Sequence, residues 1–147
     1  MKWQKLRAFI CDYEDDERVE LPYKTEVAHI AQRFTAKLQE LDFQTPGYHD
    51  IYVKTLSTLR HEQIAFHQAP EAEIICLQAG IDPTVINQLY GNNRDDYLVR
   101  LLAKCLKAVC KRDGLDFSKV KTVEKLLLQF RTKLESLHLG RVDIDLA

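Results

Sequence analysis

Three polar side chains that can recognise nucleic-acid bases lie within one short stretch of this 147-residue chain. Asn87 and Gln88 carry amide groups, which can form paired hydrogen bonds with adenine, and the methyl group of Thr84 can contact that of thymine. We predict that all three lie on the outward face of a helix beginning at Pro83, because the apolar residues between them would face inward. The chemistry that this stretch indicates is recognition by hydrogen bonding.

The surrounding residues predict two helices joined by a tight turn. Residues 71–79 carry a helical pattern that ends at Gly80, the residue type that best tolerates a left-handed helix terminus. Asp82 can cap a second helix, and Pro83 suits its first position because the missing N–H is not needed there. Five apolar residues are spaced so that two crossed helices could share a small core: Ile75, Ala79, Ile81, Ile86 and Leu89.

Residues 72–91, AEIICLQAGIDPTVINQLYG, resemble the helix-turn-helix of the phage-repressor/Cro-like family of DNA-binding proteins. The resemblance continues to Val109 and covers about a quarter of the chain. It implies a dimeric transcriptional regulator whose second helix enters the major groove of double-stranded DNA, although that helix contains no Lys or Arg. It also implies a set of base and phosphate contacts: Gln78, Thr84, Asn87, Gln88, Tyr90, Asn92, Asn93 and Arg94.

A basic row follows at helical spacing: Arg100, Lys104, Lys107 and Lys111. Such a row can contact phosphates, or it can line the solvent face of an amphipathic helix.

Residues 12–20, DYEDDERVE, concentrate negative charge. Six acidic residues against Arg18 give a net charge of −5, which leaves +4 on the remainder of a chain whose overall charge is −1. Such a segment can steer a basic partner toward the protein. The alternative function is therefore a non-enzymatic inhibitor, such as an immunity protein or an antitoxin, that neutralises a basic, toxin-like protein. The candidate partner-binding residues are Asp12, Glu14, Asp15, Asp16 and Glu17.

No motif in the sequence predicts an enzyme, a cofactor or a metal site. His61 and Glu62 could open a zinc-protease motif, but that motif needs a second histidine where Ala65 stands. The four cysteines are scattered among apolar residues, which predicts buried, reduced thiols and a cytoplasmic protein. No apolar run approaches the roughly 20 residues that span a bilayer, so no membrane is expected as a partner.

The periodicity of apolar residues predicts an all-α fold of about six or seven helices in a single domain. An N-terminal helical extension with an acidic loop would cover residues 1–45, a helix-turn-helix core residues 48–112, and a C-terminal helix residues 118–139. The last helix could pack on the domain or form a dimer seam. The other helices are expected at residues 3–11, 25–42, 48–66 and 94–112.

Overall fold

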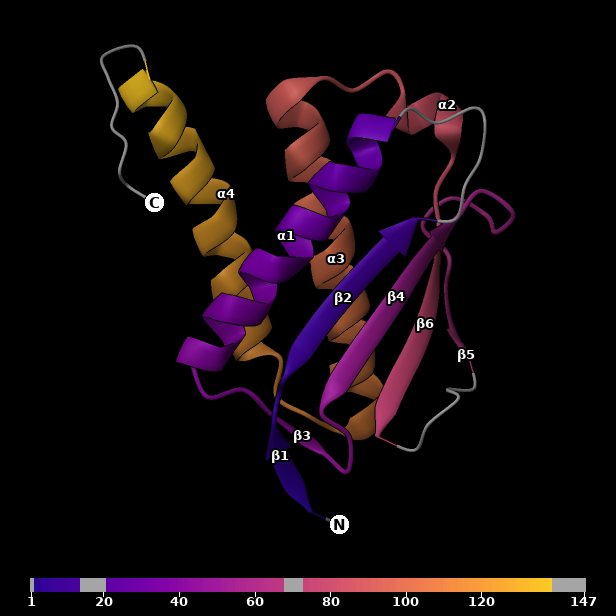
Figure 1. Ribbon diagram of the computed structural model, residues 1–147, viewed down its shortest axis with the longest axis vertical. Coiled ribbons are helices and arrows are strands. Elements are labelled where there is room, and N and C mark those ends of the chain that lie inside the picture. The colour runs from indigo at the N-terminus through magenta and orange to yellow at the C-terminus, as the bar shows by residue number, and fades with distance from the viewer. Residues whose placement is uncertain (1, 14–20, 68–72, 139–147) are drawn as a thin grey trace.

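The computed structural model describes residues 2–13, 21–67 and 73–138. This part of the chain forms a mixed α/β fold, with a sheet on one side and three long helices on the other (Figure 1). The prediction of an all-α fold with six or seven helices is therefore wrong. The elements in chain order are β1 (Trp3–Lys5), β2 (Ala8–Tyr13), α1 (Leu21–Glu40), β3 (Gln44–Pro46), β4 (Asp50–Leu56), β5 (Ile64–His67), β6 (Ile74–Gly80), α2 (Pro83–Ile86), α3 (Gly91–Asp113) and α4 (Ser118–His138).

The main sheet has the strand order β2-β4-β6-β5. Strands β2, β4 and β6 run parallel, and β5 pairs antiparallel with β6. The connection from β2 to β4 contains α1, since parallel strands need a long crossover connection. Strands β1 and β3 form a separate two-stranded antiparallel sheet.

The helices predicted over residues 3–11, 48–66 and 71–79 are replaced by strands. Strands β4 and β6 are only seven residues long and contain β-branched residues such as Ile51, Val53 and Ile75. Short apolar runs of this kind do not distinguish a strand from a buried helix by periodicity. The predictions failed because these segments pair with one another across large sequence separations.

The predicted helix-turn-helix is also wrong, since β6 occupies the place of its first helix. Its second helix exists as α2, but α2 is only four residues long. The local cap is as expected: Pro83 stands at the first turn, and the Thr84 N–H donates to Asp82 Oδ1 at 2.9 Å. The capping residues thus predicted the start of α2 correctly, but they could not predict that a strand, β6, precedes it.

Helix α3 is the centre of the hydrophobic core. It packs against α1 and α4, and its C-terminal end reaches β5, where the Arg112 guanidinium lies 4.7 Å from the Phe66 ring centre. Residues Leu98, Leu102 and Leu106 are fully buried. Val99 and Ala103, on a neighbouring side of the helix, are also buried, so α3 needs apolar cover on more than one side. The sheet, α1 and α4 provide that cover.

Side chains of α1 occupy the free edge of β2. The Phe9 N–H donates to Thr35 Oγ1 at 2.9 Å, and the Thr35 hydroxyl lies 3.1 Å from the Phe9 carbonyl oxygen. Gln39 Nε2 donates to the carbonyl oxygens of Leu6 and Arg7 at 3.2 and 3.0 Å. Since an unpaired edge strand can recruit another strand, these contacts protect β2 from pairing with a second chain.

Replacing Gly80 with Val should lower the free energy of unfolding by more than about 1 kcal/mol, because the added side chain overpacks a buried site. The physical reason differs from the expected left-handed turn, since Gly80 ends a strand. A Cβ atom at Gly80 would lie 1.9 Å from the Arg60 carbonyl oxygen. Urea unfolding measures the loss, with Gly91→Asn as the control: Gly91 has a φ of +51° and open space beside it, and Asn tolerates that φ. Equal stability of the Val variant and the wild type would contradict this packing.

Replacing Thr35 with Val should destabilise the protein by about 1–3 kcal/mol, because the Phe9 N–H loses its acceptor. Thr122→Val is the matched control: the hydroxyls of Thr35 and Thr122 each lie 3.0 Å from the carbonyl oxygen one helical turn earlier, but Thr122 is exposed on α4. Thermal and urea unfolding should show a loss for Thr35→Val and little change for Thr122→Val. Similar losses in both variants would argue against protection of the β2 edge.

Candidate functional site

One face of the main sheet is covered by the helices, and the other face is open. The residues of β2 alternate, so that Phe9, Cys11 and Tyr13 are buried while Ile10 and Asp12 are exposed. The Phe9 ring makes an edge contact with Phe34 of α1, which identifies the buried side as the helix side. In the described part of the chain, no helix packs on the opposite side (Figure 1). We call that side the open face; its residues are Ala8, Ile10, Asp12, Asp50, Tyr52, Lys54, Ala65, His67, Ile74, Cys76 and Gln78.

An apolar row crosses the middle of the open face. The strand register aligns Ile10 with Tyr52 and Tyr52 with Cys76. The Ile10 side chain is 42% exposed, and those of Tyr52 and Cys76 are half-buried. Ile74 lies one pleat away on the same face and is also half-buried. Accessible apolar side chains gathered on one surface are a feature of binding sites.

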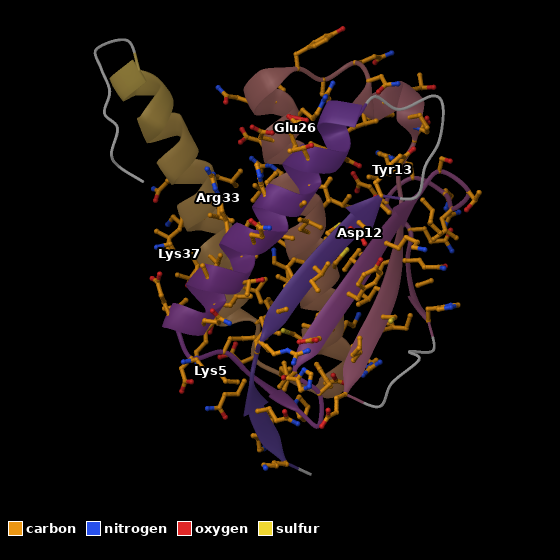
Figure 2. The ribbon with its side chains drawn as sticks, viewed as in Figure 1. Lys5, Asp12, Tyr13, Glu26, Arg33 and Lys37 are labelled. Carbon is orange, nitrogen blue, oxygen red and sulfur yellow. The ribbon has the colours of Figure 1, made fainter. Side chains whose placement is uncertain are left out.

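Asp12 bounds this row at the carboxyl end of β2. Figure 2 shows Asp12 and Tyr13 at that end of the strand, with Glu26 on the adjoining end of α1. The Tyr52 hydroxyl donates to Asp12 Oδ2 at 2.6 Å, and the Thr55 hydroxyl donates to the Asp12 carbonyl oxygen at 3.1 Å. The hydrogen bond to Asp12, together with partial burial, raises the pKa of Tyr52 to about 12. Tyr52 therefore stays neutral, and its hydrogen bond fixes the first carboxylate of the acidic segment.

An ion-pair cluster bounds the row at the other end of the strands. Arg7 makes two hydrogen bonds to the Asp50 carboxylate, of 3.0 and 2.5 Å. His49 Nδ1 lies 3.0 Å from Asp50 Oδ1, and His49 Nε2 lies 3.2 Å from Glu73 Oε1. Burial alone would raise the pKa of Asp50, but the contacts with Arg7 and His49 outweigh burial and lower it. Asp50 is thus an ionised, paired carboxylate at the polar rim of the open face.

Cys76 lies at the centre of the open face. Its thiol is half-buried, and partial burial raises its pKa. Cys11, Cys105 and Cys110 are buried. The reactivity of the Cys76 thiol toward an alkylating reagent should therefore show whether the open face is covered.

The structure does not bring the eight predicted DNA contacts onto one surface. Gln78 lies on the open face, within β6. Thr84 on α2, Gln88 and Tyr90 in the connection that follows it, and Asn93 in the first turn of α3 are exposed, with Tyr90 74% exposed. Asn87 and Asn92 are half-buried in the same region. These side chains do not form the face of a recognition helix.

Arg94, the predicted phosphate contact, is buried with 8% of its surface exposed. Its guanidinium donates to Glu26 at 3.2 Å and to the Leu89 carbonyl oxygen at 3.1 Å. Burial raises the pKa of Glu26, against the opposing influence of Arg94. Arg94 therefore joins α3 to α1.

Two members of the predicted basic row are paired within the protein: Lys104 with Glu62 at 3.3 Å and Lys107 with Glu124 at 2.8 Å. Among the described residues, nothing supports DNA binding or repression. Of the predicted partner-binding residues, Asp12 is exposed beside the apolar row, while Glu14, Asp15, Asp16 and Glu17 lie outside the described residues.

The described residues contain no group of three or more His, Cys, Asp or Glu side chains that could hold a metal ion. Within the same residues, none of the helices has the length and apolar character needed to cross a membrane. No family model, curated protein or solved structure matches this chain.

Sequence reasoning missed Ile10, Tyr52 and Ile74 as site residues. The alternation within AFICDY was a signal for β2, since inward and outward residues alternate along a strand. The signal was short, and six residues with this composition also fit a helix. The alignment of Ile10 with Tyr52 depends on strand register, which no local pattern supplies.

Acidification should weaken the stabilising contribution of Asp50. Because its pKa is lowered in the folded protein, this contribution is present above the ordinary value of 3.8 and is lost as the pH falls through the folded pKa. Asp50→Asn should therefore lower stability at pH 7 by about 1 kcal/mol, since Arg7 is largely exposed. The difference from the wild type should shrink toward pH 2, as urea unfolding across this range would show.

Glu40→Gln is the control for this experiment, because Glu40 is an exposed carboxylate on α1 away from the open face. Its stability should follow the wild-type pH profile in parallel. A constant difference between Asp50→Asn and the wild type from pH 7 to pH 2 would contradict the role of the ion pair.

Proposed function

We propose that this protein is a binding module that neutralises a basic partner protein by packing against it through the open face of the sheet. The open face carries the proposal. Parallel sheets are almost always covered on both faces, and here side chains of β2, β4 and β6 stay accessible in the described part of the chain. In this function the protein acts by binding, without catalysing a reaction.

The open face has the layout of a protein-binding surface. Its centre is the apolar row of Ile10, Tyr52 and Cys76, and its rim is polar, with Asp12 at one end and the Arg7–Asp50 pair at the other. Protein interfaces commonly combine an apolar centre that excludes water with a polar rim. Ile10 would enter a pocket of the partner, since it is the most exposed aliphatic side chain of the row.

The acidic segment that begins at Asp12 favours a basic occupant of the open face. The segment 12–20 carries a net charge of −5 in sequence and begins at Asp12, which lies on the open face. A basic partner would be attracted and oriented by this segment, which increases the rate of association. A second copy of this chain would bring another segment of charge −5, so repulsion disfavours it as the occupant. DNA would be repelled for the same reason.

The cysteines support a cytoplasmic location within this proposal. All four are free thiols, although the chain is small enough that disulfides would stabilise it in an oxidising compartment. A partner of this module would accordingly be a cytoplasmic protein, or one that is neutralised before it leaves the cytoplasm.

Photo-cross-linking at position 10 tests the proposal. A photoreactive phenylalanine analogue in place of Ile10 should form a covalent adduct with a basic protein in the source cells, whereas the same analogue at Gln32, exposed on α1, should not. The captured protein should bind the purified wild-type chain, and its binding should protect Cys76 from alkylation. Adducts that form only at position 32, or only with a second copy of this chain, would overturn the proposal.

Charge and apolar variants separate the two parts of the interface. Ile10→Asp should weaken binding of the captured partner by at least about tenfold, because burying an unpaired carboxylate is costly, and Gln32→Asp should not change the affinity. Reversing the charge of Asp15 and Asp16 should slow association and reduce its salt dependence, with little effect on dissociation. Calorimetry and stopped-flow measurements report these quantities. Unchanged affinity in Ile10→Asp would exclude the open face as the binding surface.

A further inference from the structure

The loop between β4 and β5 lies against the carboxyl end of β6. The Gly80 N–H donates to the Gln63 carbonyl oxygen, and the Glu62 N–H donates to the Gly80 carbonyl oxygen, both at 2.8 Å. Glu62 holds a φ of +62°, which a residue with a side chain seldom adopts. Residues that keep such a backbone conformation are held in place by their surroundings.

His61 extends from this loop to the first residues of α2. The backbone N–H of Asp82, the N-cap of α2, donates to His61 Nδ1 at 3.0 Å. The imidazole stacks on the Tyr97 ring of α3, with ring centres 5.8 Å apart and planes 5° apart. Because Nδ1 accepts a hydrogen bond, it carries no proton, and the proton of the neutral ring is on Nε2.

Charged and titratable groups surround His61 on three elements. Glu62, on the same loop, places Oε2 3.6 Å from His61 Nε2. From α3, Tyr97 places its hydroxyl 3.4 Å from Nε2, and Lys104 pairs with Glu62 at 3.3 Å. Asp82, from the connection after β6, has a carboxylate that is already engaged by the Thr84 N–H. Burial raises the pKa of Tyr97, so its hydroxyl stays neutral at physiological pH.

A proton on Nδ1 is incompatible with the observed contact. The imidazolium ring has N–H groups on both nitrogens, so Nδ1–H would face the N–H of Asp82 and two donors would oppose each other. The charged ring would instead be drawn to the carboxylates of Glu62 and Asp82. Attraction to Asp82 competes with the cap of α2, because the same carboxylate accepts from Thr84.

We propose that His61 acts as a pH-sensitive latch between the β4–β5 loop and α2. The neutral ring accepts the hydrogen bond from the N-cap residue Asp82, and protonation of the ring breaks that hydrogen bond. Histidine is the side chain that ordinarily changes charge between pH 5 and pH 8. Release would loosen the start of α2, while the backbone hydrogen bonds of Glu62 and Gln63 to Gly80 keep the loop on β6. The latch lies at the carboxyl end of β6 and does not depend on the proposed partner.

Nuclear magnetic resonance of the full chain between pH 8 and pH 5 tests the latch. The amide signal of Asp82 should lose its hydrogen-bond shift with the same midpoint as the His61 ring nitrogens. Protection of that amide from exchange, corrected for the intrinsic pH dependence, should fall by at least about tenfold. An Asp82 amide that stays protected while His61 titrates would overturn the proposal.

His61→Asn removes the titration and keeps an acceptor, since the Asn side-chain oxygen can occupy the place of Nδ1. In this variant the Asp82 amide should stay protected down to pH 5. His67→Asn is the matched control, because His67 is an exposed histidine on β5, and it should keep the wild-type pH dependence.

The ring tautomer of wild-type His61 at pH 8 is a test that needs no variant. The nitrogen chemical shifts should report a proton on Nε2. A proton on Nδ1 would exclude the latch, whatever the stability of the variants.

Discussion

Burial of α3 is the constraint on which the rest of the structure depends. Its buried residues Leu98, Leu101 and Ala103 point to different sides of the helix and require apolar cover on more than one side. The sheet supplies one side, and α1 and α4 supply the others. All three long helices therefore gather on one face of the sheet. Within residues 2–13, 21–67 and 73–138, the opposite face is left without a helix as a consequence of where the helices are needed.

The β2 edge of the main sheet is protected from pairing with another strand, whereas the open face of the sheet is accessible. Thr35 of α1 bonds the backbone of Phe9 in β2, and Gln39 bonds the carbonyl oxygens of the two residues before β2, so both occupy backbone groups that a strand from another protein would use. Strand β5, at the other edge, is only four residues long. This arrangement favours the proposed mode of binding, in which the partner packs side chains onto the open face, with Ile10 and Tyr52 at its centre. The acidic segment beside Asp12 would set the direction of approach.

Sequence patterns predicted an element correctly where the residues of that element alone carried the pattern. The helices predicted at residues 25–42, 94–112 and 118–139 correspond to α1, α3 and α4, because several turns of apolar periodicity mark a long amphipathic helix. The cap of α2 at Asp82 was also predicted correctly, since capping depends on neighbouring residues.

The sheet, and with it the open face, was decided by the tertiary structure. Residues 74–80 form a strand because β4 and β5 pair with them on either side, and only β5 is close in sequence. Arg94 became a buried link to Glu26, since α1 packs where a phosphate contact had been expected. The sequence alone thus determined the existence of the long helices, the N-cap of α2 and the position of the negative charge along the chain. Strand pairing, register and the choice of covered face are non-local, because each depends on residues that meet only when the chain has folded.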